Sequence, residues 1–233
     1  MKNKNRIWIY PLFIMCALFL ATSSCKKDNN NSNSNPSNTI TDVDGNVYGY
    51  VVIGTQTWLG ENLKTTHYND GTAIPNVTNG AIRDTLTTPA YFWYNDDIAN
   101  KATYGALYNW LAVNKGILAP KGWHVASFDE WGILYTYLGG ADAAGAHLKE
   151  KGAAHWGSTN ISDNSSGFTA LPGGDSNLDG NFGDIGVYGW WWSATFSDDH
   201  DAFALMMSPG STGINGGRNN PDQCGLSVRG IKN

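Results

Sequence analysis

The stretch at residues 104–131 constrains the fold of this chain most, because it carries two helix signals separated by a short turn. The first signal is a set of apolar residues at helical spacing, ended by Gly116: Tyr104, Leu107, Tyr108 and Leu111. In the second, Ser127 and Glu130 form a capping box, in which each side chain accepts a hydrogen bond from the backbone amide of the other residue. The stretch therefore predicts two consecutive helices, one starting at Tyr104 and one starting after Ser127.

The second predicted helix presents one apolar face and ends at Gly139 and Gly140. That face consists of Phe128, Trp131, Leu134, Tyr135 and Leu138. A short third helix is predicted at residues 139–151, with Ala143, Ala146 and Leu148 facing inward.

Short strands are predicted on both sides of these helices. Residues 40–63 indicate a hairpin that turns at Gly54, because β-branched and aromatic residues flank a Gly-Thr-Gln turn. Later strands are expected at residues 167–171, 186–195, 202–207 and 225–231, and the last of these would close a sheet beside the hairpin. The pattern predicts an α+β fold with two main helices, short irregular antiparallel strands and long loops.

Six motifs occur in order along the chain: IGTQTW with ENL at 53–63, YGALYNW at 104–110, PKGW with DEW at 120–131, GFTALPGG at 167–174, GWWWSAT at 189–195 and SVR at 227–229. Together they resemble the Fibrobacter succinogenes major paralogous domain, which occurs in surface lipoproteins of Bacteroidetes and related bacteria. The resemblance covers residues 42–233. The motif ending at Trp131 and the terminal Ser-Val-Arg are also similar to the sulfatase-modifying-factor branch of the C-type-lectin-like fold. The resemblance therefore implies that fold, but no particular activity.

Residues 1–24 are predicted to be a lipoprotein signal peptide. Three basic residues precede an apolar run at residues 7–21, which is shorter than the ~20 residues that a membrane span needs. The residues before Cys25 resemble the relaxed lipobox of Bacteroidetes lipoproteins, which implies cleavage before Cys25 and a lipid on its sulfur. An ordinary signal peptide cleaved near Ala21, or a retained anchor, is the alternative. Residues 25–39 would then form a polar tether, and residues 40–233 the domain.

Cys224 is the only cysteine outside the leader and the predicted lipidation position, so no internal disulfide is expected. Members of the resembled family often carry cysteines at the positions of Ala119 and Gly230. The resemblance therefore implies that one bridge is missing here and that packing holds these segments together. Cys224 is predicted to be a free, buried thiol without an assigned role.

Charge excludes one class of partner. The net charge of −5 becomes −8 without residues 1–24, because this leader holds three basic residues and no acid. A nucleic-acid partner requires a basic face, which this domain does not carry. The lipid on Cys25 instead predicts attachment to a membrane, and the expected location is the outer membrane with the domain exposed at the cell surface.

Asp175, Asn177 and Asp179 begin a pattern typical of calcium loops, in which oxygen ligands alternate before a glycine. Gly186 occupies the position where such a loop needs a bidentate glutamate. A metal-free turn is therefore the alternative to a calcium site, and no other cofactor is predicted.

The chain is predicted not to be an enzyme. It has no nucleophile motif and no histidine pair at metal-ligand spacing, and Cys224 alone does not supply the reactive or copper-binding pair of a formylglycine-generating enzyme. The alternative is a hydrolase acting on carbohydrate or peptide, which would need Asp175, Asp179 and Asp184 to converge with Asp198 in a cleft.

Three consecutive tryptophans at 190–192 alternate between two faces if they lie in a strand. One face then belongs to the core, and the other is available to stack on the apolar faces of sugar rings. Packing of the tryptophans in the core is the alternative. The predicted ligand-binding residues are Trp191, Asp198, Asp199 and Arg218.

Thr85 is a candidate for modification, because Asp84-Thr85-Leu86 matches the three-residue O-glycosylation signal described for Bacteroidetes. A match of this length also arises by chance.

The predicted function is non-catalytic recognition of a glycan or a surface protein by a lipid-anchored domain. The anchor, the tether and the acidic, aromatic-rich domain favour it. Besides the hydrolase, the sequence leaves open a structural subunit of a surface assembly, which would self-associate through a large apolar patch.

Overall fold

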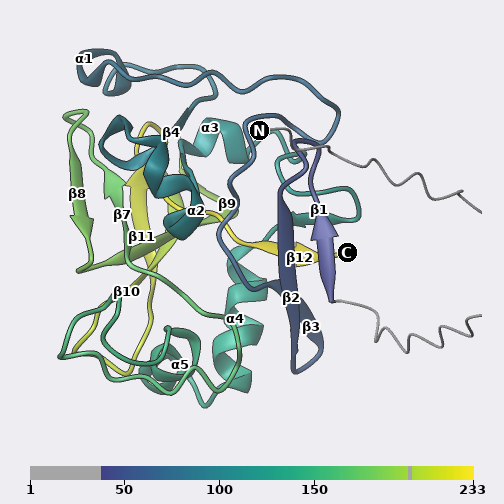
Figure 1. Ribbon diagram of the computed structural model, residues 1–233, viewed down its shortest axis with the longest axis vertical. Helices are drawn as coiled ribbons and strands as arrows, with labels where there is room; N and C mark the ends of the chain where they lie inside the picture. Colours follow the sequence, from purple (N-terminus) through teal and green to yellow (C-terminus); the bar gives the residue numbers. More distant parts are fainter. Residues whose placement is uncertain (1–37, 199–200) are drawn as a thin grey trace, which may run out of the picture. The chain divides into compact units, whose positions relative to one another are not determined.

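The computed structural model describes residues 38–198 and 201–233, in which all helices lie between β3 and β7 and only strands follow the last helix (Figure 1). The leader, Cys25, Asp199 and His200 lie outside the described residues. The fold is mixed α and β, as predicted, and most of its regular structure is in sheets. Across the described ranges, no helix combines the length and the apolar character that crossing a membrane requires.

The first sheet joins the start of the described chain to its end, in the strand order β1-β2-β3-β12-β6. Its strands are β1 (Thr39–Thr41), β2 (Val47–Ile53), β3 (Gln56–Leu59), β6 (Trp123–Val125) and β12 (Gly230–Lys232). Ile53 pairs with Gln56, so Gly54 lies in a two-residue turn and the predicted hairpin is confirmed. Strand β12 pairs with β3 through Ile231 and Trp58, which confirms that the last strand closes this sheet.

The second sheet has the strand order β11-β10-β9-β7-β8. Its strands are β7 (Gly173–Ser176), β8 (Phe182–Ile185), β9 (Gly189–Asp198), β10 (Asp201–Met207) and β11 (Asn215–Pro221). Strands β9 and β10 confirm two of the predicted strands, with shifted ends. The strand predicted at 167–171 is wrong, because Thr169 has a left-handed backbone with φ of 54° and hydrogen-bonds to the Asn164 side chain.

Helix α4 (Phe128–Tyr137) begins at the predicted capping box, with both hydrogen bonds between Ser127 and Glu130 present. It is followed by Gly139 and Gly140, both with positive φ. The next helix, α5 (Ala141–Leu148), is the predicted third helix. Its buried residues are Ala144, Gly145 and Leu148, so the predicted inward face was correct only at Leu148.

The helix predicted to start at Tyr104 is wrong. The chain there forms α2 (Lys101–Tyr104), β5 (Leu107–Tyr108), which pairs with β4 (Tyr91–Phe92), and α3 (Trp110–Val113). Gly105 interrupts the helix with φ of 78°, and a Cβ atom there would lie 2.6 Å from the Leu63 carbonyl oxygen. The next amide, of Ala106, donates to that same oxygen at 2.9 Å. A long-range hydrogen bond therefore replaces the helical one.

Three shorter helical segments cover the loops before this region: α1 (Gly80–Arg83), η1 (Tyr94–Asp96) and η2 (Ile98–Asn100). The Asn79 side chain caps α1 by accepting from the Ala81 amide. The positive φ of Asn95 and Asp96 bends η1 sharply. These segments place Arg83 and Tyr94 beside the β7–β8 hairpin.

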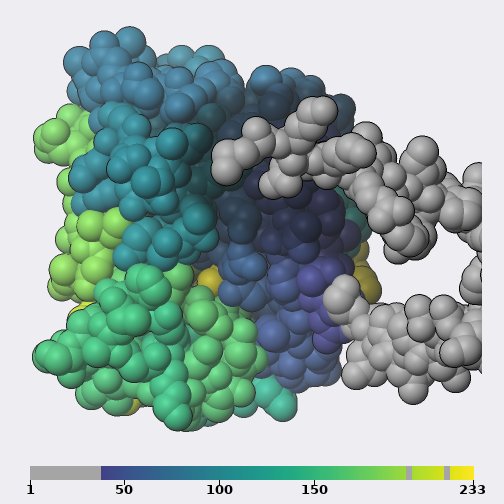
Figure 2. All heavy atoms as spheres, in the orientation of Figure 1, coloured from purple at the N-terminus to yellow at the C-terminus, as the bar shows by residue number. Residues whose placement is uncertain are grey.

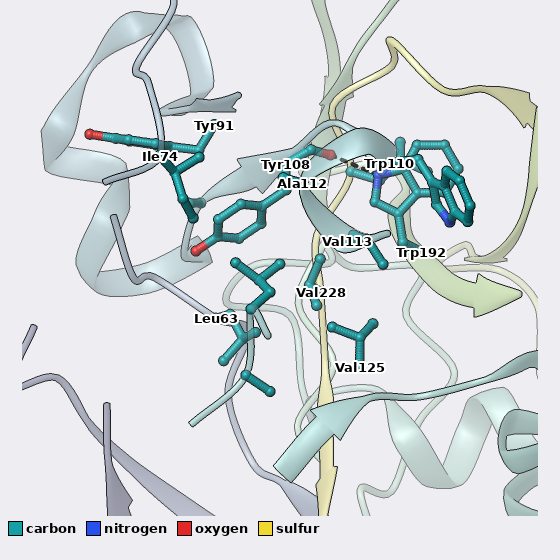
Figure 3. Packing of buried hydrophobic residues seen from close by; sticks show 14 of the residues in the cluster. Leu63, Ile74, Tyr91, Tyr108, Trp110, Ala112, Val113, Val125, Trp192 and Val228 are labelled. Atoms are coloured by element: carbon teal, nitrogen blue, oxygen red, sulfur yellow. Dashed lines mark hydrogen bonds between the residues drawn. The ribbon is translucent and has the colours of Figure 1, made fainter. Parts of the chain in front are cut away.

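Strand β9 separates two buried hydrophobic clusters. Trp192 belongs to the first, and its Nε1 donates to the Tyr108 carbonyl oxygen at 2.7 Å (Figure 3). Trp191 belongs to the second, where the rings of Trp58 and Trp131 lie 4.9 Å apart. Alternating side chains of one strand thus enter two different parts of the core.

Candidate functional site

Residues from five of the six sequence motifs meet in one buried polar network centred on Asn62 and Arg229. We call it the motif network. Its members are Asn62, Tyr104, Phe168, Thr169, Trp191, Ser227 and Arg229.

The Asn62 amide organises one side of this network. Its Oδ1 accepts from Trp191 Nε1 at 2.9 Å and from Arg229 Nε at 2.8 Å. Its Nδ2 donates to the Tyr104 carbonyl oxygen at 2.9 Å and to Ser227 Oγ at 3.2 Å. Every donor and acceptor site of this buried amide is used, which makes it a structural centre of the fold.

The Arg229 guanidinium organises the other side. It is 1% exposed and donates to the carbonyl oxygens of Leu59 and Phe168 at 2.7 Å and of Thr169 at 2.9 Å. Burial lowers its pKa to about 9, with the charge of Glu61 acting in the opposite direction, so the group stays charged at neutral pH. Backbone carbonyl dipoles thus surround a buried cation and join the segment of Arg229 to the end of β3 and to the loop at Phe168 and Thr169.

Lys149 and Arg83 repeat this arrangement at two other loops. Lys149 Nζ donates to the carbonyl oxygens of Ser208, Pro209 and Ser211 at 2.7 to 3.0 Å, and burial lowers its pKa to about 8. Arg83 Nε donates to the Gly180 carbonyl oxygen at 2.9 Å, and its Nη1 donates to Asp96 at 2.9 Å. Sequence analysis missed these roles, because a buried cation has no local signature when its acceptors lie elsewhere in the chain.

The interpretation of Trp191 as a stacking platform is wrong. Trp191 is 0% exposed, its Nε1 is bonded to Asn62, and a Cβ atom at Gly189 would overlap its ring. The alternation of faces along the strand was predicted correctly. However, both faces of β9 are covered where Trp191 and Trp192 lie, so neither ring reaches solvent.

The other predicted ligand residues follow Trp191 along the second sheet. Asp198 ends β9 opposite Asp201, and Arg218 lies in β11 opposite Ala204. Asp199 lies outside the described residues. Because Trp191 points into the core, it takes no part in a surface site.

The exposed aromatic site lies one residue earlier, at Trp190. The half-buried rings of Tyr188, just before β9, and Trp190, near its start, have centroids 6.3 Å apart. The exposed Asp184 accepts from Trp190 Nε1 through Oδ2 at 3.4 Å. We call Asp184, Tyr188 and Trp190 the hairpin platform. The β7–β8 hairpin lies at the left edge of the face in Figure 2, in light green.

Backbone geometry sets this site apart from an ordinary strand edge. Asp184 has φ of 68°, a left-handed conformation that is uncommon outside glycine. The amides of Val187 and Tyr188 donate to its carbonyl oxygen at 2.9 and 2.8 Å. The tight turn thus holds Asp184 and the two rings together.

Asp175 adds a second carboxyl group next to Asp184. It lies in β7 opposite Gly183, is 8% exposed, and its Oδ1 has no hydrogen-bond partner among the described residues. Burial, and then the charges of Asp184 and Asp179, raise its pKa to about 7. This group therefore changes its protonation near neutral pH.

The predicted calcium loop forms a hydrogen-bonded turn. The Asp179 carboxylate accepts from the Asn181 amide at 3.0 Å and from its Nδ2 at 2.9 Å, while the Gly180 amide donates to the Asn177 carbonyl oxygen at 2.9 Å. Within residues 38–198 and 201–233, no group of three or more His, Cys, Asp or Glu side chains is placed to hold a metal ion. The alternation of Asp175, Asn177 and Asp179 therefore gains no support as a metal site from this arrangement.

Two further candidates are placed plainly by the structure. Cys224 is free and buried, as predicted, and burial followed by the charge of Asp175 raises its pKa to about 12. Thr85 is exposed just after α1, where its Oγ1 donates to the Ile82 carbonyl oxygen at 3.1 Å. Its glycosylation stays a prediction.

One cluster contains the residue types of a catalytic triad without its geometry. Ser165 Oγ lies 2.9 Å from His147 Nδ1, and both Asp163 carboxylate oxygens lie 3.1 Å from the same nitrogen. A proton relay needs the serine and the aspartate on opposite ring nitrogens. The cluster is therefore a surface hydrogen-bond group rather than a nucleophile and its base.

The outer face of α4 carries an open groove with a volume of about 500 Å³. Ile133 is 50% exposed there and Tyr137 65%. At one end of the groove the ring of Phe128 stacks on that of Phe203, with centroids 4.7 Å apart. This apolar groove suits contact with another protein.

Comparison with known proteins gives one match. A family model described as the Fibrobacter succinogenes major domain matches residues 51–232, a range that contains all six motifs. No curated protein and no solved structure matches the chain.

Proposed function

The chain belongs to the Fibrobacter succinogenes major domain family, and on that premise we propose that it is a lipid-anchored surface protein whose domain binds glycans without catalysis. The hairpin platform carries this proposal. The ring faces of Trp190 and Tyr188 offer apolar contact to the face of a sugar ring, and Asp184 accepts hydrogen bonds from its hydroxyls. One side of Trp190 packs on the core, which keeps its orientation fixed in the absence of ligand.

The anchor and the location are supported by the sequence. Cys25 follows a basic and apolar leader, and the polar residues after it lead directly to the first strand at Thr39. We propose lipid attachment at Cys25 and display of the domain from the outer membrane. Globomycin inhibition of processing, or mass spectrometry of the mature N-terminus, tests this part.

We also propose a C-type-lectin-like arrangement for the fold. Two features support it. Strand β12 pairs with β3 and so brings the end of the chain to the N-terminal hairpin. Helices α4 and α5 are consecutive in the sequence, after β6 of the first sheet and before β7 of the second. An experimental structure compared with lectin-like domains tests this assignment.

The glycan proposal is tested with full-length protein in mild detergent on a glycan array, followed by calorimetry with the sugars that bind. The expected result is that Trp190→Ala lowers affinity at least about tenfold, which is about 1.4 kcal/mol. The control is Phe196→Ala, which removes an exposed aromatic ring of strand β9 outside the platform. A folded protein that binds no sugar, or equal losses for both variants, would contradict the proposal. Loss of binding with a chelator would instead direct attention to Asp175, Asn177 and Asp179.

A second candidate function, self-association in a surface assembly, is favoured by the α4 groove. Ile133 is half exposed at its centre, so Ile133→Glu would place a charge within the contact. Sedimentation velocity of the two proteins over a concentration series tests this. An oligomer that Ile133→Glu dissociates would support the assembly role, and a monomer at all concentrations would exclude it.

The hydrolase alternative has one observation in its favour, the neighbouring carboxyl groups of Asp175 and Asp184. A glycosidase acid needs a raised pKa, which Asp175 has. Measuring the release of reducing sugar from each bound glycan tests this alternative. Turnover that Asp175→Asn abolishes would replace the recognition role with a catalytic one.

A further inference from the structure

We infer that the hairpin platform selects sugars that carry an ammonium group over neutral and acidic sugars. This inference rests on the proposed glycan-binding function and specifies its ligand. It starts from the charges of the β7–β8 hairpin and from the ring of Trp190.

Carboxyl groups dominate the electrostatics of this hairpin. Asp179 lies in its turn, Asp184 in β8 and Asp175 in β7, and Asp179 and Asp184 are exposed. The charges of Asp184 and Asp179 both contribute, after burial, to the raised pKa of Asp175, so the three groups share one electrostatic environment. An incoming cation would lower the repulsion among them, and an incoming anion would increase it.

Among the side chains that the structure describes, no lysine or arginine forms an ion pair with the exposed carboxylates of Asp179 and Asp184. Arg83 is the cation in contact with the hairpin, and its guanidinium lies 4.4 Å from the Phe182 ring centre. However, Arg83 is only 5% exposed and is already paired with Asp96. The charge of Asp184 therefore remains available to a ligand.

The aromatic rings favour the same sign of charge. An ammonium group within about 6 Å of a tryptophan ring face is attracted by the ring quadrupole. The bond from Trp190 Nε1 holds the Asp184 carboxylate at the edge of that ring, 3.4 Å from the nitrogen. A sugar stacked on Trp190 with its ammonium group toward Asp184 would gain both attractions at once. A uronic acid in that position would meet a carboxylate instead.

The expected selectivity is moderate, because the platform is open to solvent. An exposed cation–π contact and an exposed ion pair together correspond to a preference of about five- to tenfold. The test uses calorimetry on full-length protein in mild detergent, with three oligosaccharides of equal length. These are fully deacetylated glucosamine, fully acetylated glucosamine and galacturonate oligomers, at a pH where the glucosamine amine is protonated.

Asp184→Asn is the decisive variant, because it removes the charge while keeping the size of the side chain, and asparagine tolerates the left-handed backbone of this position. In this variant, the affinities for the amino sugar and for the acetylated sugar should differ by no more than about twofold, and the acetylated sugar should still bind. The matched control, Asp142→Asn, removes an exposed carboxylate on α5 and should keep the full preference.

The outcomes separate this inference from the function on which it rests. Binding of acetylated and amino sugars with equal affinity, both sensitive to Trp190→Ala, would overturn the inference and leave glycan recognition in place. A preference that survives Asp184→Asn, or that Asp142→Asn removes equally, would also overturn it, because the selectivity would then come from the overall negative charge. A folded protein that binds none of the three sugars would overturn both.

Discussion

Trp190 and Trp191 are neighbours in one strand, yet they form two different kinds of contact. Trp191 Nε1 donates to the neutral amide of Asn62 at 2.9 Å inside the motif network, and Trp190 Nε1 donates to the Asp184 carboxylate at 3.4 Å on the surface. The charged partner, Asp184, lies at the surface, where water solvates its carboxylate. The neutral partner, Asn62, lies in the interior, where burying a charge would be costly. The same indole group therefore has a neutral partner inside the fold at Trp191 and a charged partner at the surface at Trp190.

This contrast also explains why the motifs alone do not reveal the function. The polar side chains of Asn62 and Arg229 in the motif network form hydrogen bonds with other groups of the protein, so they are not free to bind a ligand. The hairpin platform keeps an exposed carboxylate and two half-buried rings. Mutations in the network should therefore change stability, and mutations in the platform should change binding.

The largest effect is expected for Arg229→Met. It removes the donors to the carbonyl oxygens of Leu59, Phe168 and Thr169, and leaves these buried acceptors without partners. The free energy of unfolding should fall by about 4 kcal/mol or more, measured by urea denaturation. The control Lys232→Met removes an exposed cation from the same end of the chain and should change stability by less than about 0.5 kcal/mol. A loss below about 1 kcal/mol for Arg229→Met would show that the network is not central to the fold.

The two tryptophans allow the most direct test of the comparison. Trp191→Ala should reduce the free energy of unfolding by about 3–5 kcal/mol, because it creates a cavity and removes one of the two donors to Asn62 Oδ1. Trp190→Ala should cost less than about 1.5 kcal/mol, because its ring is only half buried. Thermal and urea unfolding of both variants measure the difference. Equal losses would mean that Trp190 is a core residue and that the platform has been assigned incorrectly.

A disulfide next to the motif network should raise the stability of the fold without changing sugar binding at the hairpin platform. A Cβ atom at Gly230 would lie 3.7 Å from the Cβ of Ala119, which suits a disulfide, although the tip of Leu59 at 2.9 Å must move. Ala119→Cys with Gly230→Cys should raise the free energy of unfolding by about 2–4 kcal/mol under oxidising conditions. Unfolding with and without reductant checks this. Sugar binding should not change, and a change would show that the two regions are coupled.

The smallest effect concerns Asp175 beside the platform. Its pKa is raised from 3.8 to about 7 by burial and by the neighbouring carboxylates. Its contribution to stability is therefore fully present below its unfolded-state pKa and is lost as the pH rises through about 7. Between pH 5 and pH 8 the free energy of unfolding should fall by about 2–3 kcal/mol because of this group, and Asp175→Asn should remove that pH dependence. A slope that is identical in the variant would assign the pH dependence to other groups.

Several elements could be predicted because their signals act over a few residues. The capping box links Ser127 and Glu130, which are three residues apart, and the hairpin requires only a turn at Gly54 between two runs of strand-forming residues. The six motifs were sufficient to place the chain in its family. The unpaired state of Cys224 followed from counting cysteines.

Other features depend on contacts between distant parts of the chain. The helical pattern at Tyr104 is interrupted by the bond from Ala106 to Leu63, and the acceptors of Arg229 lie 60 to 170 residues away from it. Alternation along β9 predicts which tryptophans share a face of the strand. It does not predict that both faces are covered at Trp191 and Trp192, or that Trp190 is partly exposed to solvent. Residue spacing encodes hydrogen bonds that close within one turn or one hairpin. Which buried donor meets which carbonyl, and which ring remains in water, depends on the path of the whole chain, because those contacts form only when the sheets and loops pack together.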